Sequence, residues 1–198
     1  MIELAEREWG GKVDIVVNNA GVALLGRLAE FDEEAWDTTM AVNVRAAMSV
    51  TKAFLPSLLL KPTQNSEKDE TDVIERGNGK GGVIVNVSSV AGHAALANHA
   101  AYCASKAALE MLTKCMTAEW AALGIRANTV APTVVLTAMG KAIWEGTPQG
   151  DEMLKRLPMR RFARPEEVAD VVAFLASCLL YTSPSPRDQR GSRMPSSA

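Results

Sequence analysis

The sequence predicts an α/β domain in which a parallel sheet carries helices on both faces. Short β-branched runs recur along the chain, and longer helical patterns separate them. The runs are also apolar at nearly every position, as expected of strands that are buried on both faces. The length of 198 residues fits a single domain.

Three runs are the predicted strands. Residues 13–17 are short, β-branched and followed by turn residues, which predicts a buried strand. Residues 83–87 follow a pair of glycines and predict a second buried strand. Residues 125–130 predict a third strand, which ends before Pro132.

Helical patterns separate these strands. Residues 31–60 predict a helix with Asp32 as its N-cap and acidic residues in the first turn. Residues 98–123 form a long alanine-rich pattern, closed by Gly124. Residues 165–178 predict a further helix with proline in its first turn.

Two polar segments interrupt the pattern. Residues 61–81 are mixed in charge and predict a solvated surface loop inserted into the domain. Within and just after it, residues 77–82 formally match G-x-G-x-x-G, but these glycines precede a strand, whereas a dinucleotide-binding turn follows one. Residues 182–198 hold five serines, three prolines and three arginines, a composition typical of disorder.

Composition excludes several classes of function. The formal net charge of −2 gives no electrostatic footprint for nucleic acid or an anionic membrane. The longest apolar run, residues 171–181, is too short to cross a bilayer, which takes about 20 residues. Three widely spaced cysteines and two histidines suggest no metal site, and they favour a reducing, cytoplasmic location.

The segment Tyr102-Cys-Ala-Ser-Lys106 is the strongest chemical signal. Positions four apart share one face of a helix, so the phenol and the ammonium can enter one site. A free phenol has a pKa of about 10, and a nearby cation lowers it toward neutrality. The simpler interpretation is a tyrosine and a lysine that share an exposed helix surface.

Ser89 follows the strand predicted at residues 83–87 and lies thirteen residues before Tyr102. Sites in parallel sheets form beyond the carboxyl ends of the strands. A hydroxyl there can hydrogen-bond a substrate carbonyl while Tyr102 delivers a proton. The alternative is a serine that caps a helix or a turn.

Two amide-bearing segments accompany this pair. Asn18-Asn-Ala-Gly21 follows the first strand, where small residues let a flat ligand approach the backbone. Asn43 is a lone amide among apolar residues in the helix at residues 31–60. It is either a core amide with its own partners or a holder of water in a proton relay.

In their order and spacing, these motifs resemble the short-chain dehydrogenase/reductase family over roughly residues 2–177. The resemblance implies a Rossmann-like fold, a nicotinamide cofactor, a small carbonyl substrate and a homo-oligomer, a tetramer in one related branch. It implies Tyr102 as the general acid/base, Ser89 as the group that orients the carbonyl, and Asn43 as the organiser of relay water. Lys106 would lower the Tyr102 pKa and hold the nicotinamide ribose.

The resemblance also implies cofactor-binding residues: Asn19, Ala20 and Gly21 beside the adenosine, and Pro132, Val135 and Thr137 in the loop that flanks the nicotinamide. We expect NADP(H) rather than NAD(H). The Pro132-Thr133 pair, with His99 and Trp144, is similar to the L-xylulose (dicarbonyl) reductase and tetrameric carbonyl reductase branch. His99 and Trp144 would then line the substrate pocket, the alternative being a helix-start residue and a packing aromatic.

The chain departs from the family at both ends. We expect Met1 to lie within the helix before the family's fourth strand, so that the first βαβ unit, with its pyrophosphate-binding glycine turn, is missing. We also expect the final strand to be missing, and residues 178–198 resemble translated sequencing adapter, the alternative being a genuine divergent basic tail. We therefore expect a partial domain at residues 1–177, a non-homologous tail, low stability and weak dinucleotide binding.

The sequence leaves several functions open. The first is an NAD(P)-dependent oxidoreductase that interconverts a carbonyl and a secondary alcohol. A second is an inactive fragment or pseudoenzyme that acts only through oligomerisation, for which the alanine-rich helix at residues 100–123 would pack against another subunit. A third, a 3-oxoacyl carrier-protein reductase or hydroxysteroid-type member, is disfavoured by Pro132-Thr133.

Overall fold

The computed structural model describes residues 2–10, 13–59 and 81–177. Nearly all of the predicted loop at 61–81 and the whole tail at 178–198 therefore lie outside the described residues. In chain order the elements are α1 (Ile2–Trp9), β1 (Ile15–Asn18), η1 (Leu28–Glu30), α2 (Glu33–Met40), η2 (Ala41–Arg45), α3 (Ala46–Leu58), β2 (Val83–Val87), η3 (Val90–Gly92), α5 (Ala100–Trp120), η4 (Ala121–Leu123), β3 (Arg126–Val130), α6 (Ala138–Trp144), α7 (Pro148–Arg156) and α8 (Pro165–Ala176).

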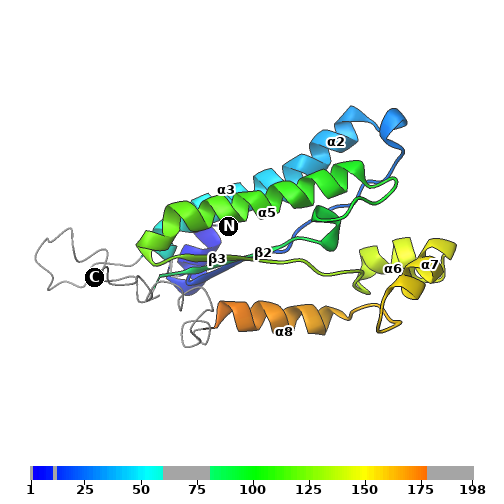
Figure 1. Ribbon diagram of the computed structural model, residues 1–198. Helices are drawn as coiled ribbons and strands as arrows, with labels where there is room; N and C mark the ends of the chain where they lie inside the picture. The colour runs from blue at the N-terminus through cyan, green and yellow to red at the C-terminus, as the bar shows by residue number, and fades with distance from the viewer. Residues whose placement is uncertain (1, 11–12, 60–80, 178–198) are drawn as a thin grey trace, which may run out of the picture.

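The strands form a parallel sheet in the order β1-β2-β3. Helices α3 and α5 cover one face and α8 lies against the other, so the chain forms three layers (Figure 1). This arrangement confirms the predicted α/β class. Because the strands are parallel, they all end at the same edge of the sheet, and their last residues are Asn18, Val87 and Val130.

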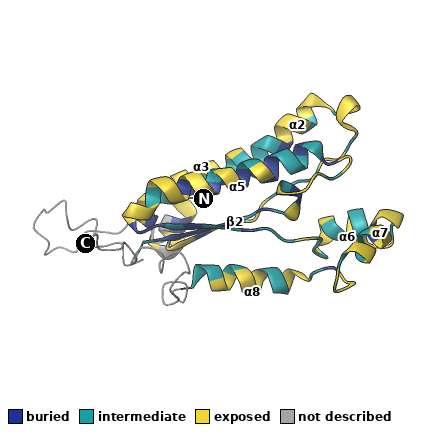
Figure 2. Cartoon of the chain, viewed as in Figure 1, coloured by how far each residue is buried: buried dark blue, intermediate teal, exposed yellow. Residues whose placement is uncertain are grey.

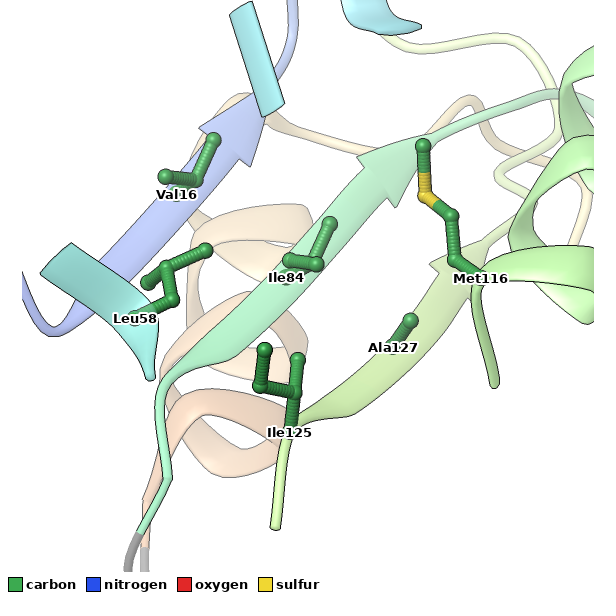
Figure 3. Packing of buried hydrophobic residues seen from close by; sticks show 6 residues of the cluster. All are labelled: Val16, Leu58, Ile84, Met116, Ile125 and Ala127. Atoms are coloured by element: carbon green, nitrogen blue, oxygen red, sulfur yellow. The ribbon is translucent and has the colours of Figure 1, made fainter. Parts of the chain in front are cut away.

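A hydrophobic core lies between the sheet and helices α3 and α5. It joins one face of the three strands to Leu58 of α3 and Met116 of α5 (Figure 3). Ile84, the second residue of the central strand β2, is completely buried. Burial of each such side chain stabilises the fold by about 1.5–3 kcal/mol.

A second cluster packs α8 against the opposite face. Val83, Val85 and Val130 contact the apolar side of this helix, which consists of Val168, Val172 and Leu175. β2 is thus buried on both faces, as predicted, and most of its residues are dark blue in Figure 2. The Arg126 guanidinium donates to the backbone carbonyls of Leu175 and Ser177, at 2.8 and 2.9 Å, and so holds the end of α8.

The prediction that the first strand is buried was wrong for one of its faces. Ile15 and Val17 are 46% and 43% exposed, whereas Val16 between them is buried. The contacts of α8 fall on β2 and β3, so among the described elements none packs closely over this face of β1. The strand also begins at Ile15, two residues later than predicted.

The predicted helix at 31–60 is confirmed in part. The Asp32 carboxylate caps it by accepting from the Ala35 N–H at 2.9 Å. The helix is not α-helical throughout, because residues 41–45 form a π-helical turn between α2 and α3. This turn carries Asn43.

The other helix predictions need smaller corrections. α5 starts at Ala100, and Gly124 closes the following η4 turn with φ of 79°, the left-handed geometry that glycine favours. α8 begins at Pro165, as expected, but ends at Ala176, two residues earlier than predicted, because Ser177 is extended and forms its C-cap. Helices α6 and α7 were not predicted, and each begins with a threonine N-cap.

Candidate active site

Ser89 lies where β2 ends and faces the start of α5. Its hydroxyl accepts from the Ala91 N–H at 3.2 Å and so caps η3. The same side chain hydrogen-bonds the Tyr102 hydroxyl. The interpretation of Ser89 as a capping serine is therefore confirmed, and its role in orienting a substrate carbonyl stays a prediction.

Tyr102 and Lys106 share one face of α5. The Lys106 ammonium lies 5.6 Å from the centroid of the Tyr102 ring and donates to the Val87 carbonyl at 2.8 Å. The lysine is 4% exposed, and its burial lowers its pKa to about 8.

The pKa of Tyr102 is raised in this structure, which corrects the expected lowering by Lys106. Burial of the phenol is the larger cause, and the hydrogen bond from Ser89 offsets it only in part. Burial disfavours the charged form of each group, so it raises the pKa of the tyrosine and lowers that of the lysine.

Asn43 is 1% exposed, and its amide makes three hydrogen bonds to the protein. Its Oδ1 accepts from the Val22 N–H at 2.8 Å, and its Nδ2 donates to the Val22 carbonyl and the Ser105 hydroxyl, both at 2.9 Å. The amide thus ties the segment after β1 to α5, beside Lys106. A water-holding role stays a prediction.

The segment after β1 approaches these groups closely. A Cβ on Gly21 would lie 3.3 Å from the Asn43 Oδ1 and 3.4 Å from the Lys106 Nζ. Asn19 and Ala20 are exposed at the same edge of the sheet. Gly21 therefore lies against Asn43 and Lys106, and the expected contact of Asn19, Ala20 and Gly21 with a cofactor stays a prediction.

A buried polar chain behind the site was missed by sequence reasoning. The Asn18 amide donates to the Asn86 Oδ1 at 2.7 Å and to the Thr51 hydroxyl at 2.9 Å. Asn86 in turn donates to the Thr113 hydroxyl at 2.7 Å. An asparagine in the otherwise apolar run of residues 83–87 was the available signal, since a buried amide requires partners.

The loop after β3 lies beside η3, the turn that Ser89 caps. The Pro132 carbonyl accepts from the Val90 N–H at 3.0 Å. Val135 pairs with Ala163 in an isolated parallel bridge, and Thr137 caps α6 by accepting from the Gly140 N–H at 3.2 Å. The structure thus gives Val135 and Thr137 backbone-fixing roles, and their contact with a cofactor stays a prediction.

His99 and Trp144 lie side by side. Their rings stack with centroids 5.8 Å apart and 22° between planes, and the His99 ring meets that of Tyr102 edge-on at 6.4 Å. Both border a cavity of about 570 Å³. Its other lining residues mix apolar side chains with polar and charged ones in about equal numbers: Leu25, Gly26, Arg27, Leu96, Ala97, Asn98, Ile143, Gln149, Glu152, Met153 and Arg156.

Two other kinds of site are absent from the described part of the chain. No group of three or more His, Cys, Asp or Glu side chains there could hold a metal ion. None of the described helices is long and apolar enough to cross a membrane.

Comparison with known proteins finds relatives among sugar and polyol oxidoreductases. The chain is 41% identical to an L-xylulose reductase of Bos taurus over 177 residues, which cover 88% of this chain and 66% of that protein. It is also 41% identical to a D-threitol dehydrogenase of Mycolicibacterium smegmatis, covering 84% of this chain and 57% of that protein. The chain thus spans about three-fifths to two-thirds of the length of these relatives.

Solved structures share the fold. A gluconate 5-dehydrogenase from Burkholderia cenocepacia J2315, in complex with NADP and tartrate, matches with a TM-score of 0.74 and 32% identity, over 91% of this chain and 64% of that one. The family model for short chain dehydrogenase matches residues 1–148. The chain belongs to the short-chain dehydrogenase family.

Proposed function

We propose that this chain carries the catalytic part of an NAD(P)-dependent oxidoreductase that interconverts a carbonyl and a secondary alcohol. One observation supports this most directly: the Tyr102 hydroxyl is bonded to Ser89, and the Lys106 ammonium lies over the Tyr102 ring. An acid, a carbonyl-orienting hydroxyl and a cation together form the set that carbonyl reduction requires.

The residues present fit the nicotinamide and ribose end of a dinucleotide. The Lys106 ammonium has three N–H donors, of which the Val87 carbonyl engages one. Its pKa is lowered by burial, so further acceptors such as ribose hydroxyls would stabilise its charge. When bound, the cofactor supplies the hydride.

The protein's residues handle the proton. In the reductive direction Tyr102 donates its proton to the substrate oxygen, and Ser89 donates a hydrogen bond to the same oxygen. We propose that the Lys106 ammonium, 5.6 Å from the Tyr102 ring centroid, stabilises the resulting phenolate, although burial raises the pKa of Tyr102 overall in this structure. Asn43 lies close behind them, and we propose that it holds the relay water when its bonds to Val22 open.

We propose a small hydroxylated ketone, of the L-xylulose or vicinal dicarbonyl type, as the substrate. The stacked pair His99 and Trp144 gives the cavity one flat wall beside Tyr102, and such aromatic faces pack against the C–H side of sugars. The relatives named for L-xylulose, threitol and glycerol support this class.

NADP(H) is the proposed coenzyme. The solved gluconate 5-dehydrogenase contains NADP, which supports this choice, while one relative is named an NAD-dependent glycerol dehydrogenase. Parallel assays with NADPH and NADH at equal concentration decide between them.

We also propose self-association. Met48 of α3 and Met111 of α5 are 42% and 57% exposed on the outer surface of the two long helices, whose outward faces are largely yellow in Figure 2. Apolar side chains on paired helices suit an interface between copies. Light scattering of the purified chain measures it.

The test of the activity is reduction of diacetyl and L-xylulose, followed through NADPH absorbance. It is run on this chain, and on this chain joined to the family's amino-terminal segment. Tyr102→Phe is expected to lose activity about 10²–10⁴-fold, whereas Tyr181→Phe keeps it. Full activity in Tyr102→Phe contradicts the mechanism, and a folded, inactive wild-type chain in both forms supports the pseudoenzyme alternative.

A further inference from the structure

Glu110 is a buried carboxylate that the proposed reaction does not use. It is 8% exposed and lies on α5, one helical turn after Lys106. Its Oε1 accepts from the Ser88 hydroxyl at 2.7 Å, and its Oε2 lies 3.0 Å from the His93 Nε2. A carboxylate at this depth is tolerated only where such partners compensate its charge.

The bond to Ser88 belongs to a repeated pattern. Three consecutive residues at the end of β2 each bind a different turn of α5. Val87 accepts from Lys106, Ser88 donates to Glu110, and Ser89 bonds Tyr102. Positions 102, 106 and 110 are four residues apart and therefore share one helix face. The strand end is thus fixed to α5 at three points, of which two are the proposed catalytic groups.

The turn that follows lies directly against the helix. A Cβ on Gly92 would come within 2.9 Å of the Glu110 Oε1 and 3.1 Å of the Lys106 carbonyl carbon. Any larger residue there would push the turn away from α5. His93, the next residue, reaches Glu110 from the solvent side, since its side chain is 63% exposed. Glu110 therefore bonds both ends of the segment 88–93.

We propose that Glu110 is a positioning residue: by binding Ser88 and His93 it holds the segment 88–93 against α5, and so keeps the Ser89 hydroxyl on Tyr102. The importance of this positioning role for catalysis rests on the proposed function. The geometry itself can be tested without substrate or cofactor, because Tyr102 reports on the Ser89 contact directly.

The ionisation of Tyr102 is the readout. The sequence has two tyrosines, so Tyr181→Phe leaves Tyr102 alone. Replacing it biosynthetically with 3-fluorotyrosine allows the phenol to be titrated by ¹⁹F NMR in the full chain. The Ser89 bond lowers the Tyr102 pKa. Releasing the turn in Glu110→Ala should therefore raise that pKa, by about half a unit or more.

Three companion variants make the test specific. Glu110→Gln keeps an acceptor for Ser88, so in this variant the pKa of Tyr102 is expected to equal that of the wild type. Glu119→Ala removes an exposed glutamate from the same helix and is expected to change nothing. Ser88→Ala breaks the same contact from the other side and should reproduce the shift, which keeps the proposal testable where Glu110→Ala does not fold.

The outcomes are distinct. A raised Tyr102 pKa in Glu110→Ala or Ser88→Ala, with recovery in Glu110→Gln, supports the proposal. A wild-type titration in a folded Glu110→Ala or Ser88→Ala protein overturns it. In an active protein kcat should fall with KM little changed. Absence of carbonyl reduction in the wild type counts against the proposed function alone, because the titration still decides the role of Glu110.

Discussion

The imidazole of His99 stacks on the indole of Trp144, with ring centroids 5.8 Å apart, although the two residues lie on different elements. His99 precedes α5, and Trp144 ends α6. The contact fixes α6 beside Tyr102 and forms a wall of the cavity.

Replacing Trp144 should therefore weaken substrate binding more than turnover. An aromatic pair contributes about 0.5–1.5 kcal/mol beyond its buried area, so Trp144→Leu should raise KM about 2- to 10-fold. Steady-state kinetics with L-xylulose measures this effect. Trp36→Leu, at a partly exposed tryptophan of α2, is the matched control. An unchanged KM in Trp144→Leu would show that the stack lies outside the substrate site.

Burial of Lys106 predicts a pH-dependent stability. Its pKa falls from 10.5 to about 8 on folding, so the folded chain binds fewer protons than the unfolded chain between these values. The free energy of unfolding of the wild type should therefore rise, relative to Lys106→Met, as the pH increases from about 8 to 10.5. The whole effect is of the order of 1–3 kcal/mol. Urea unfolding of both proteins at several pH values measures the difference, and parallel pH curves would contradict it.

Asn43 should be one of the most sensitive positions for stability. Asn43→Leu leaves the Val22 backbone groups and the Ser105 hydroxyl without their buried partner. Each such loss costs about 1–3 kcal/mol, so for the three groups together we expect a destabilisation of at least about 3 kcal/mol. Chemical denaturation measures it, with Asn19→Leu as the exposed control, expected to change stability by less than about 0.5 kcal/mol.

Arg126 should control the last turn of α8. Its guanidinium binds the carbonyls of Leu175 and Ser177, so Arg126→Met leaves the helix end without these charged donors. Hydrogen exchange of the α8 amides should become at least about 10-fold faster, while that of β2 changes less. Arg156→Met, at an exposed position of α7, is the control. Unchanged exchange in α8 would show that its packing on the sheet is sufficient.

Features that depend on local chemistry were predictable from the sequence. The three strands, the Asp32 cap and the Gly124 turn follow from residues next to one another in the chain. The meeting of Ser89 with Tyr102 followed from one topological rule, that parallel strands end at one edge of the sheet.

Features that depend on distant neighbours were not predictable. The exposed face of β1 reflects where α8 packs, which the composition of β1 cannot reveal. The raised pKa of Tyr102 reflects burial by other segments. Helices α6 and α7 contain Gly140 and Gly150, residues that weaken a helical pattern but are needed there, because a Cβ would meet the backbone carbonyls of Val135 and Trp144.

The π-helical turn at residues 41–45 makes chain length, and not only residue type, critical in this helix. Each residue of an α-helix turns the chain by about 100°. Deleting one residue between Ala41 and Arg45 would leave a regular helix of good composition, yet α2 would be rotated by that angle relative to α3. The Asn43 amide would then lose its alignment with Val22, so this segment should accept substitutions at positions other than Asn43 but no single-residue deletion.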